Sequence, residues 1–143
     1  MMKQILAGAV VSASLLVAAS VAQADMYGDA EMGVWANDQS VAGGTVSAEK
    51  IVAEHNGWLV VHRTDESQKP GAVVGYAPLK AGENMDVTAI LTETVNPGDH
   101  LMLMLHGEEG GSQTGVFEYT LGATEDGPVK VDGNLVMAVI AAQ

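Results

Sequence analysis

Short apolar runs separated by glycine and proline are the feature that most restricts how this chain can fold. The 143 residues include 17 Gly and 4 Pro. Brief apolar runs that are rich in Val and bounded by Gly, Pro, Asn or Asp are typical of β-strands. The sequence therefore predicts strands at residues 58–61, 72–74, 87–91, 101–105, 116–119 and 135–140.

Helical periodicity is weak after residue 25. The nearest pattern, residues 47–55, places Ala48, Ile51 and Val52 at helical spacing, but Gly57 ends it. Several short strands without crossover helices predict an all-β fold, an antiparallel β-sandwich of the Ig-like or cupredoxin-like kind. The chain has no Cys, so this core must hold together without disulfides.

The N-terminus has the layout of a cleaved secretory signal. Lys3 precedes an apolar stretch at residues 5–21, and Ala22-Gln23-Ala24 supplies the small residues of a cleavage site. We expect residues 1–24 to be a signal peptide and residues 25–143 to form one domain. This arrangement predicts a periplasmic or secreted protein with no membrane span after cleavage.

The charge balance is strongly acidic. Six Lys and Arg stand against 18 Asp and Glu, which gives a formal net charge of −12, or −13 once Lys3 is removed with the signal. Such a balance repels nucleic acid and anionic lipid. It fits a saline medium, cationic ligands, or simple solubility.

Two stretches of the chain resemble each other. Residues 45–76 and residues 87–119 both run from a Val-Ser/Thr-Ala start through a turn and an apolar strand to a His, an acidic loop and a Tyr. The offset is 44 residues both from His62 to His106 and from Gly71 to Gly115. We expect an internal duplication, with two similar halves related by an approximate dyad. If the dyad brings the equivalent strands side by side, His62 and His106 meet.

Several segments together carry a resemblance to a known family. They are "NDQSVAGGTV", "GWLVVHRTDE", "KPGAVVGYAPLKAGENMDVTAIL", "LMLMLHGEEG", "TGVFEY" and "DGPVKVDGNLVM", spread over residues 34–137. The chain resembles an uncharacterised family of extracytoplasmic β-sandwich domains, a domain of unknown function from secreted haloarchaeal and bacterial proteins. This resemblance implies a β-sandwich outside the cytoplasm, and it assigns no functional residues.

The segment "HLMLMLHGEEGG" contains the main candidate site. In a strand over residues 100–106 the leucines point to one face, and thioethers and imidazoles alternate on the other. Soft sulfur selects Cu(I), and imidazole accepts either oxidation state of copper. The preferred interpretation of the methionines is a central strand covered on both sides, in which Met fills irregular gaps, and copper binding is the alternative. The candidate copper ligands are His100, Met102, Met104 and His106, with His62 in support.

Part of this segment is also similar to the H-x-M element of periplasmic copper-chaperone domains. The similarity is carried by His100-Leu101-Met102 after Pro97-Gly98. Those domains pair the element with an upstream His-Met and a further Met, and this chain has no such set before His100.

Acidic residues follow each histidine strand. We expect Asp65 and Glu66 to return a carboxylate to His62, and Glu108 and Glu109 to return one to His106. These acids, with Glu125, Asp126 and Asp132, are also oxygen donors for calcium, but they lack the regular spacing of a calcium loop. We therefore expect these acids to lie on a solvated surface, and calcium binding is the alternative.

Signals for catalysis are absent from the sequence. There is no G-x-S-x-G, no H-E-x-x-H, no phosphate-binding Gly loop and no Cys nucleophile. The sequence therefore predicts a small, exported, non-enzymatic binding or interaction domain for an unknown protein or small ligand, with the loops at one end as the binding surface. The alternative is a periplasmic copper-binding protein. The predicted core consists of Trp58, Val60, Leu101, Leu103, Leu105, Phe117 and Val136, although Trp58 has the alternative of an outer face beside His62.

Overall fold

The computed structural model describes residues 31–143, and this part of the chain folds into nine strands without a helix. It accordingly contains no helix long and apolar enough to cross a membrane. The predicted signal peptide lies outside the described residues. The strands are β1 (Gly33–Trp35), β2 (Thr45–Ala53), β3 (Gly57–Thr64), β4 (Val73–Leu79), β5 (Gly82–Ile90), β6 (His100–Gly107), β7 (Lys130–Val131), β8 (Asn134–Leu135) and β9 (Met137–Ala141).

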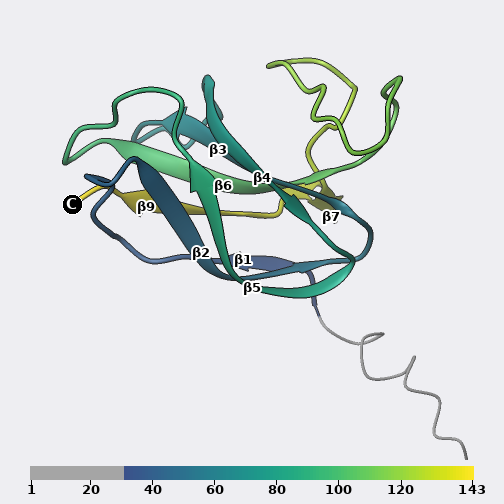
Figure 1. Ribbon diagram of the computed structural model, residues 1–143, viewed down its shortest axis with the longest axis horizontal. Coiled ribbons are helices and arrows are strands. Elements are labelled where there is room, and N and C mark those ends of the chain that lie inside the picture. The colour runs from purple at the N-terminus through teal and green to yellow at the C-terminus, as the bar shows by residue number, and fades with distance from the viewer. Residues whose placement is uncertain (1–30) are drawn as a thin grey trace, which may run out of the picture.

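Two antiparallel sheets form a sandwich. One has the order β1-β2-β5, the other has the order β4-β3-β6-β9, and β7 and β8 form a small separate hairpin. Figure 1 shows the two larger sheets as facing layers. The chain changes layer between β2 and β3, between β4 and β5, and between β5 and β6. The prediction of an all-β antiparallel sandwich is confirmed.

The strands that carry the two repeated segments pair with each other, and most of β5 precedes the second segment, which begins at residue 87. β2 pairs antiparallel with β5, and β3 pairs antiparallel with β6. This is the side-by-side arrangement that an approximate dyad requires, although duplication itself stays a prediction. The correspondence ends at the third element, because β4 is a strand and its predicted counterpart at residues 116–119 is not.

Three segments differ from the predicted strands. Residues 116–119 belong to a loop, where the backbone N–H of Glu118 donates to the Asp126 carboxylate at 2.8 Å instead of to a neighbouring strand. Residues 47–55, the nearest approach to a helical pattern, lie mostly in β2. Residues 135–140 are split between β8 and β9, since Val136 between them donates to Val129 and accepts from Leu105.

The core lies between the two large sheets. Leu59 and Val61 of β3 and the three leucines of β6 project into it, together with Val46, Ala48 and Ile51 of β2. The alternation predicted for β6 is therefore confirmed. Of the predicted core residues, Leu101, Leu103, Leu105 and Val136 belong to this core. Trp58 and Val60 are buried elsewhere, and Phe117 is only half-buried.

Candidate metal centre

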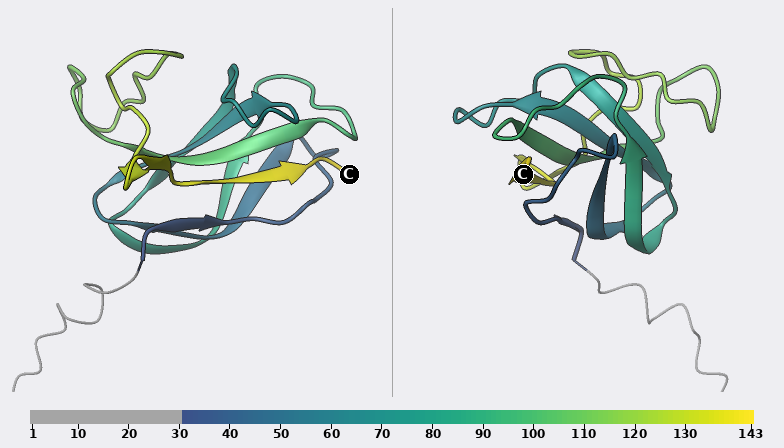
Figure 2. Two further views of the ribbon diagram at one scale, coloured as in Figure 1. Left: turned by 180° about the vertical axis from the view of Figure 1, so that it is seen from behind. Right: turned by 60° about the vertical axis from the view of Figure 1, so that its left-hand side comes forward.

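The outer face of the four-stranded sheet, which points away from the core, is also buried. We use "outer face" for a set of six side chains on β3 and β6, all of them almost or completely inaccessible to solvent: Trp58, Val60, His62, Met102, Met104 and His106. A loop at residues 108–129, called here the cover segment, rises on this side of the sheet in both views of Figure 2. This placement confirms the outer-face alternative for Trp58.

Aromatic rings attach the cover segment to the outer face. The Phe117 ring lies 5.4 Å from Trp58 and 4.4 Å from Tyr76, measured between centroids. The Tyr119 ring lies edge-on to His106 at 4.6 Å and to His62 at 5.9 Å. The cover segment therefore places aromatic rings over the two imidazoles.

Polar contacts hold the same segment in position. The buried Asp126 carboxylate accepts hydrogen bonds from the backbone N–H groups of Glu109 at 3.1 Å and Glu118 at 2.8 Å. The Trp58 indole N–H donates to Glu108 at 2.9 Å. Asp126 is thus a structural anchor, and the expectation that it is a solvated surface acid is wrong.

His62 and His106 meet under this cover. Their Nε2 atoms are 3.2 Å apart, and the ring planes are inclined by only 28°. On the opposite side of each ring, Nδ1 faces a backbone carbonyl oxygen. The distance is 2.9 Å from His62 to Gly71 and 2.7 Å from His106 to Asp126. Each imidazole is therefore oriented by a carbonyl that comes from outside its own strand.

Local backbone features bring the two rings together. The ladder between β3 and β4 shifts register between Val61 and His62, and such a bulge re-aims a side chain at the sheet. At the other end, Gly57 lies against β6, and a Cβ at Gly57 would approach the His106 carbonyl oxygen within 2.1 Å. Only glycine permits this close approach of the two strands beside His106.

The hydrogen bonds from His62 and His106 to the two carbonyl groups leave no hydrogen atom for the contact between their Nε2 atoms. A carbonyl oxygen can only accept, so Nδ1 of His62 and Nδ1 of His106 must each carry a hydrogen. A neutral imidazole has one N–H, which is thereby used. The two Nε2 atoms then direct lone pairs at each other across 3.2 Å. This contact is favourable only if the two nitrogens share a cation, either an additional proton on the line between them or a metal ion to one side of that line.

Burial acts against the additional proton. Desolvation lowers the pKa of His62, and the hydrogen bond to Gly71 opposes the shift only in part. Desolvation also lowers the pKa of His106 to about 4, with a hydrogen bond to Asp126 opposing the shift and the His62 charge adding to it. Both rings are therefore neutral at pH 7, which is the state in which an imidazole binds a metal ion.

The remaining candidate ligands lie on the same strand. Met102 is the cross-strand partner of His62, and Met104 is the partner of Val60. Both methionines are fully buried. His100, by contrast, begins β6 opposite Thr64 and is half-buried. Six residues of extended chain separate it from His106, which is about 20 Å, so His100 stands apart from the histidine pair.

The expected pairing of each histidine with its own following acids is wrong. Asp65 accepts from the Ser67 hydroxyl and backbone at the tip of its loop, and Glu108 accepts from Trp58. The physical reason is that the imidazoles point into a covered interior, whereas the acids begin the turns that leave it. Carbonyl groups of returning segments satisfy the Nδ1–H donors instead.

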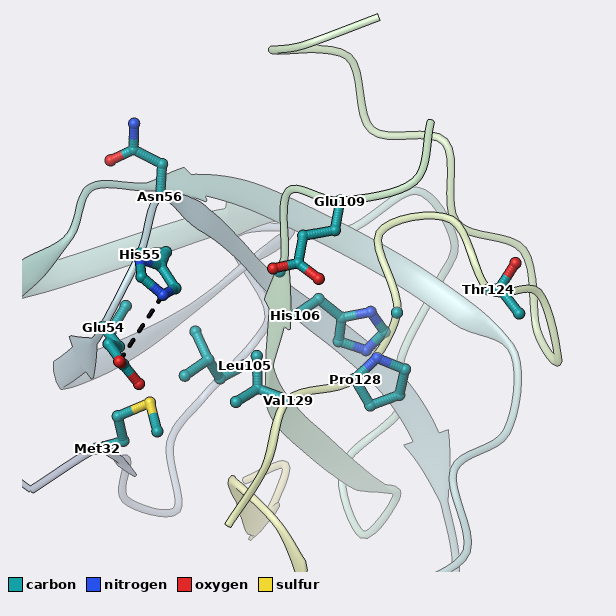
Figure 3. A pocket seen from close by; sticks show the side chains of 13 residues that line it. Met32, Glu54, His55, Asn56, Leu105, His106, Glu109, Thr124, Pro128 and Val129 are labelled. Atoms are coloured by element: carbon teal, nitrogen blue, oxygen red, sulfur yellow. Dashed lines mark ion pairs between the residues drawn. The ribbon is translucent and has the colours of Figure 1, made fainter. Parts of the chain in front are cut away.

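A cavity of 300 Å³ opens beside His106 at the end of the sandwich. Figure 3 shows Glu54 and His55 on one side of it, Glu109 above, and Pro128 and Val129 on the other. The His55 Nε2 atom lies 3.8 Å from the Glu54 carboxylate, and both side chains are exposed. The loops at this end of the molecule thus form a concave surface with mixed polar and apolar lining.

Sequence reasoning missed the groups that orient and cover the pair. Gly71 and Asp126 act through their backbone carbonyls, which no side-chain pattern announces. Tyr119 was visible only as the last residue of the repeated segment. The equal 44-residue offset was the one signal that pointed to the meeting of His62 and His106.

The fold and the site together define a class: a small all-β sandwich domain with a buried histidine pair between its outer sheet face and a loop. A family model matches residues 33–143, and the chain belongs to this family, the domain of unknown function DUF7282. No curated protein and no solved structure is detectably similar to the chain.

Proposed function

We propose that this protein is an exported, non-enzymatic binding domain that holds one transition-metal ion between His62 and His106. One observation carries the proposal: two imidazoles whose Nδ1 atoms are committed to carbonyl oxygens direct bare Nε2 atoms at each other from 3.2 Å. A metal-ligating histidine usually donates its other N–H to a carbonyl or carboxylate in this way, because that bond fixes the ring and its tautomer.

The spacing of the two nitrogens suits a metal ion. Bonds of about 2.0–2.1 Å from each Nε2 to a shared ion would subtend an angle of roughly 100° across the observed 3.2 Å separation. That angle is close to tetrahedral and far from linear. The site therefore fits an ion with three or four ligands, two of which are the imidazoles.

Export supports the same proposal. The N-terminal layout of Lys3, an apolar stretch and a small-residue cleavage site is typical of a secretory signal. A periplasmic or secreted location exposes the domain to metal ions that the cytoplasm buffers. The acidic surface, with a net charge of −12, attracts cations to the molecule over a distance set by the salt concentration.

A metal titration of the purified full chain tests this proposal. We expect one ion per chain from Zn²⁺, from Cu²⁺, or from Cu⁺ under reducing and anaerobic conditions. His62→Gln and His106→Gln should each weaken binding at least about 100-fold, since a single imidazole remains. His55→Gln and His100→Gln are matched controls, because each removes one histidine outside the pair, and they should bind as the wild type does.

Two outcomes would overturn the proposal. One is a flat response to all three ions, which would assign the N···N contact to a shared proton. The other is a site that survives both substitutions in the pair and disappears in a control variant. In either case the covered histidines would serve only to fix the cover segment on the sheet.

The 300 Å³ cavity supports a second candidate, an interaction domain that binds a protein or small ligand at the loop end. Glu54 and Glu109 on its rim favour a cationic group, and Met32 and Val129 favour an apolar one. Amide NMR shifts on adding choline, as a probe of this chemistry, should be confined to residues around the cavity. They should weaken in Glu109→Gln; shifts scattered over the surface would contradict this candidate.

A further inference from the structure

Two methionines, Met102 and Met104, share the outer face with the histidine pair. In the register of β3 and β6, the pair Val60 and Met104 lies midway between the pairs that hold His106 and His62. Since the two Nε2 atoms are 3.2 Å apart, the rings must approach each other along the strands, toward this central pair. Side chains on one sheet face at adjacent pairs are close neighbours. Met104 therefore lies on the same sheet face as the two histidines, at the pair between theirs, and Met102 lies across from His62.

These methionines do not belong to the core between the sheets. The core contains Leu101, Leu103 and Leu105 from the same strand, and it includes neither Met102 nor Met104. Both thioethers are nevertheless completely buried. They are enclosed between the sheet and the cover segment, in the same compartment as the imidazoles.

Residues 31–143 contain no thiolate donor and no cluster of acids beside the histidine pair. Within residues 31–143, no three His, Cys, Asp or Glu side chains gather where they could hold one ion. Two of the nearby acids have other tasks, since the Asp126 carboxylate accepts from two backbone N–H groups and Glu108 accepts from Trp58. Glu118, also on the cover segment, accepts from Ser112 through Oε1 and leaves Oε2 buried without a partner. Among the side chains of the outer face, the thioethers of Met102 and Met104 are the metal-binding groups that accompany the imidazoles.

The charge of the site narrows the choice of ion. Two neutral imidazoles and a thioether bring no negative charge, and the rings of Phe117 and Tyr119 close the space above them. Burying an ion without a counter-charge is expensive, and the cost rises steeply with its charge. A monovalent soft ion suits such a compartment better than a divalent one does.

We propose that the ion is Cu(I), and that the Met104 sulfur is its third ligand beside the histidine pair. This inference rests on the proposed metal-binding function and names the ion and its oxidation state. Thioether and imidazole ligands are the set that selects Cu(I) among first-row metals. The three donors come from adjacent strands of one sheet, which fixes their relative positions before the ion binds.

Competition titration of the full chain with Cu(I), Ag(I) and Zn(II) provides the test. Ag(I) is a probe of the same charge and softness that does not change oxidation state. We expect Cu(I) and Ag(I) to bind more tightly than Zn(II), and Met104→Leu to weaken both by at least roughly tenfold, the lower range for lost support at a metal site. Met85→Leu, on the exposed side of β5, is the matched control and should leave affinity unchanged.

A separate control checks that the Met104→Leu variant still folds. Leu is close to Met in volume, so Met104→Leu should cost less than about 1.5 kcal/mol of stability, and denaturant unfolding checks this. In selenomethionine-substituted protein, X-ray absorption at the selenium edge should show copper next to selenium in the wild type. That signal should persist in Met85→Leu and disappear in Met104→Leu.

The results separate this inference from the function on which it rests. Unchanged Cu(I) affinity in Met104→Leu, or tighter binding of Zn(II) than of Cu(I), would overturn the thioether ligand while leaving the histidine site in place. Failure of the wild type to bind any of the three ions would overturn the proposed function itself.

Discussion

The four-stranded sheet has two buried faces, and they are buried by different means. Its inner face presents Leu59, Leu103 and other aliphatic side chains to a second sheet. Its outer face presents imidazoles, thioethers and an indole to a loop, the cover segment at residues 108–129. The inner face stabilises the fold through apolar contact alone. The outer face also buries polar groups that need specific partners. For this reason it is the face of the sheet that can take part in binding chemistry.

The largest effect is expected on the inner face. Leu103→Ala removes a completely buried side chain from the middle of β6 and leaves a cavity between the sheets. We expect the free energy of unfolding to fall by about 4 kcal/mol, within the range for such substitutions. Urea denaturation measures it. A loss below 1 kcal/mol would mean that the inner face is not the main core.

Acid should destabilise the outer face, in metal-free protein, by a similar amount. Burial lowers the pKa of His106 to about 4, whereas an unfolded histidine titrates near 6.5. Between these values the unfolded chain binds more protons, so His106 contributes stability above about pH 6.5 and loses it as the pH falls toward 4. The difference amounts to about 3 kcal/mol.

His106→Gln isolates this effect from the other titrating groups. Glutamine keeps an amide N–H for the Asp126 carbonyl but does not titrate. Measured from pH 7 to pH 4, the unfolding free energy should fall more steeply for the wild type than for His106→Gln. Parallel curves would contradict the lowered pKa of His106.

A smaller effect is expected where the cover segment is anchored. Asp126→Ala removes the acceptor of two backbone hydrogen bonds, those from Glu109 and Glu118, and should cost about 2 kcal/mol. Asp126→Asn keeps one carbonyl acceptor and should cost less. Amide hydrogen exchange should increase within residues 108–126 and not in β2, where a uniform increase would instead indicate that the two faces unfold together.

The smallest effect concerns the rim of the outer face. Trp58→Phe keeps an aromatic ring against Phe117 but removes the N–H that donates to Glu108. We expect a loss of about 1 kcal/mol, the usual range for one hydrogen bond. Glu108→Gln is the control, since its amide oxygen still accepts from the indole. If Glu108→Gln costs as much as Trp58→Phe, the negative charge matters more than the hydrogen bond.

The inner face was predictable from the sequence and the outer face only in part. The alternation in β6 assigns Leu101, Leu103 and Leu105 to one side, because strand geometry has a fixed period of two. The meeting of His62 and His106 followed from the repeated segments. Residues 116–119 carry the composition of a strand, yet their rings pack against the sheet face and Glu118 bonds to Asp126. The apolar composition of a segment predicts that the segment is buried, but it does not predict which surface of the protein buries it.

The edge strand β5 and the backbone acceptors of the two histidines were not fully predicted, for related reasons. The first half of β5, "GENMD", is largely exposed on a strand that ends its sheet, so it lacks an apolar pattern. The carbonyl groups of Gly71 and Asp126 orient the two histidines irrespective of their side chains. Such contacts depend on where a loop returns to the sheet, which is a property of the tertiary fold.

We expect the Nε2 atoms of His62 and His106 to carry no hydrogen and to bind a metal ion, and ¹⁵N NMR of the imidazole nitrogens measures both properties. In metal-free protein at pH 7, we predict that His62 and His106 both carry hydrogen on Nδ1 and none on Nε2. One equivalent of Ag(I) should shift both Nε2 resonances and leave both Nδ1–H groups in place. An Nε2–H on either ring that persists unchanged in the presence of Ag(I) would contradict the account.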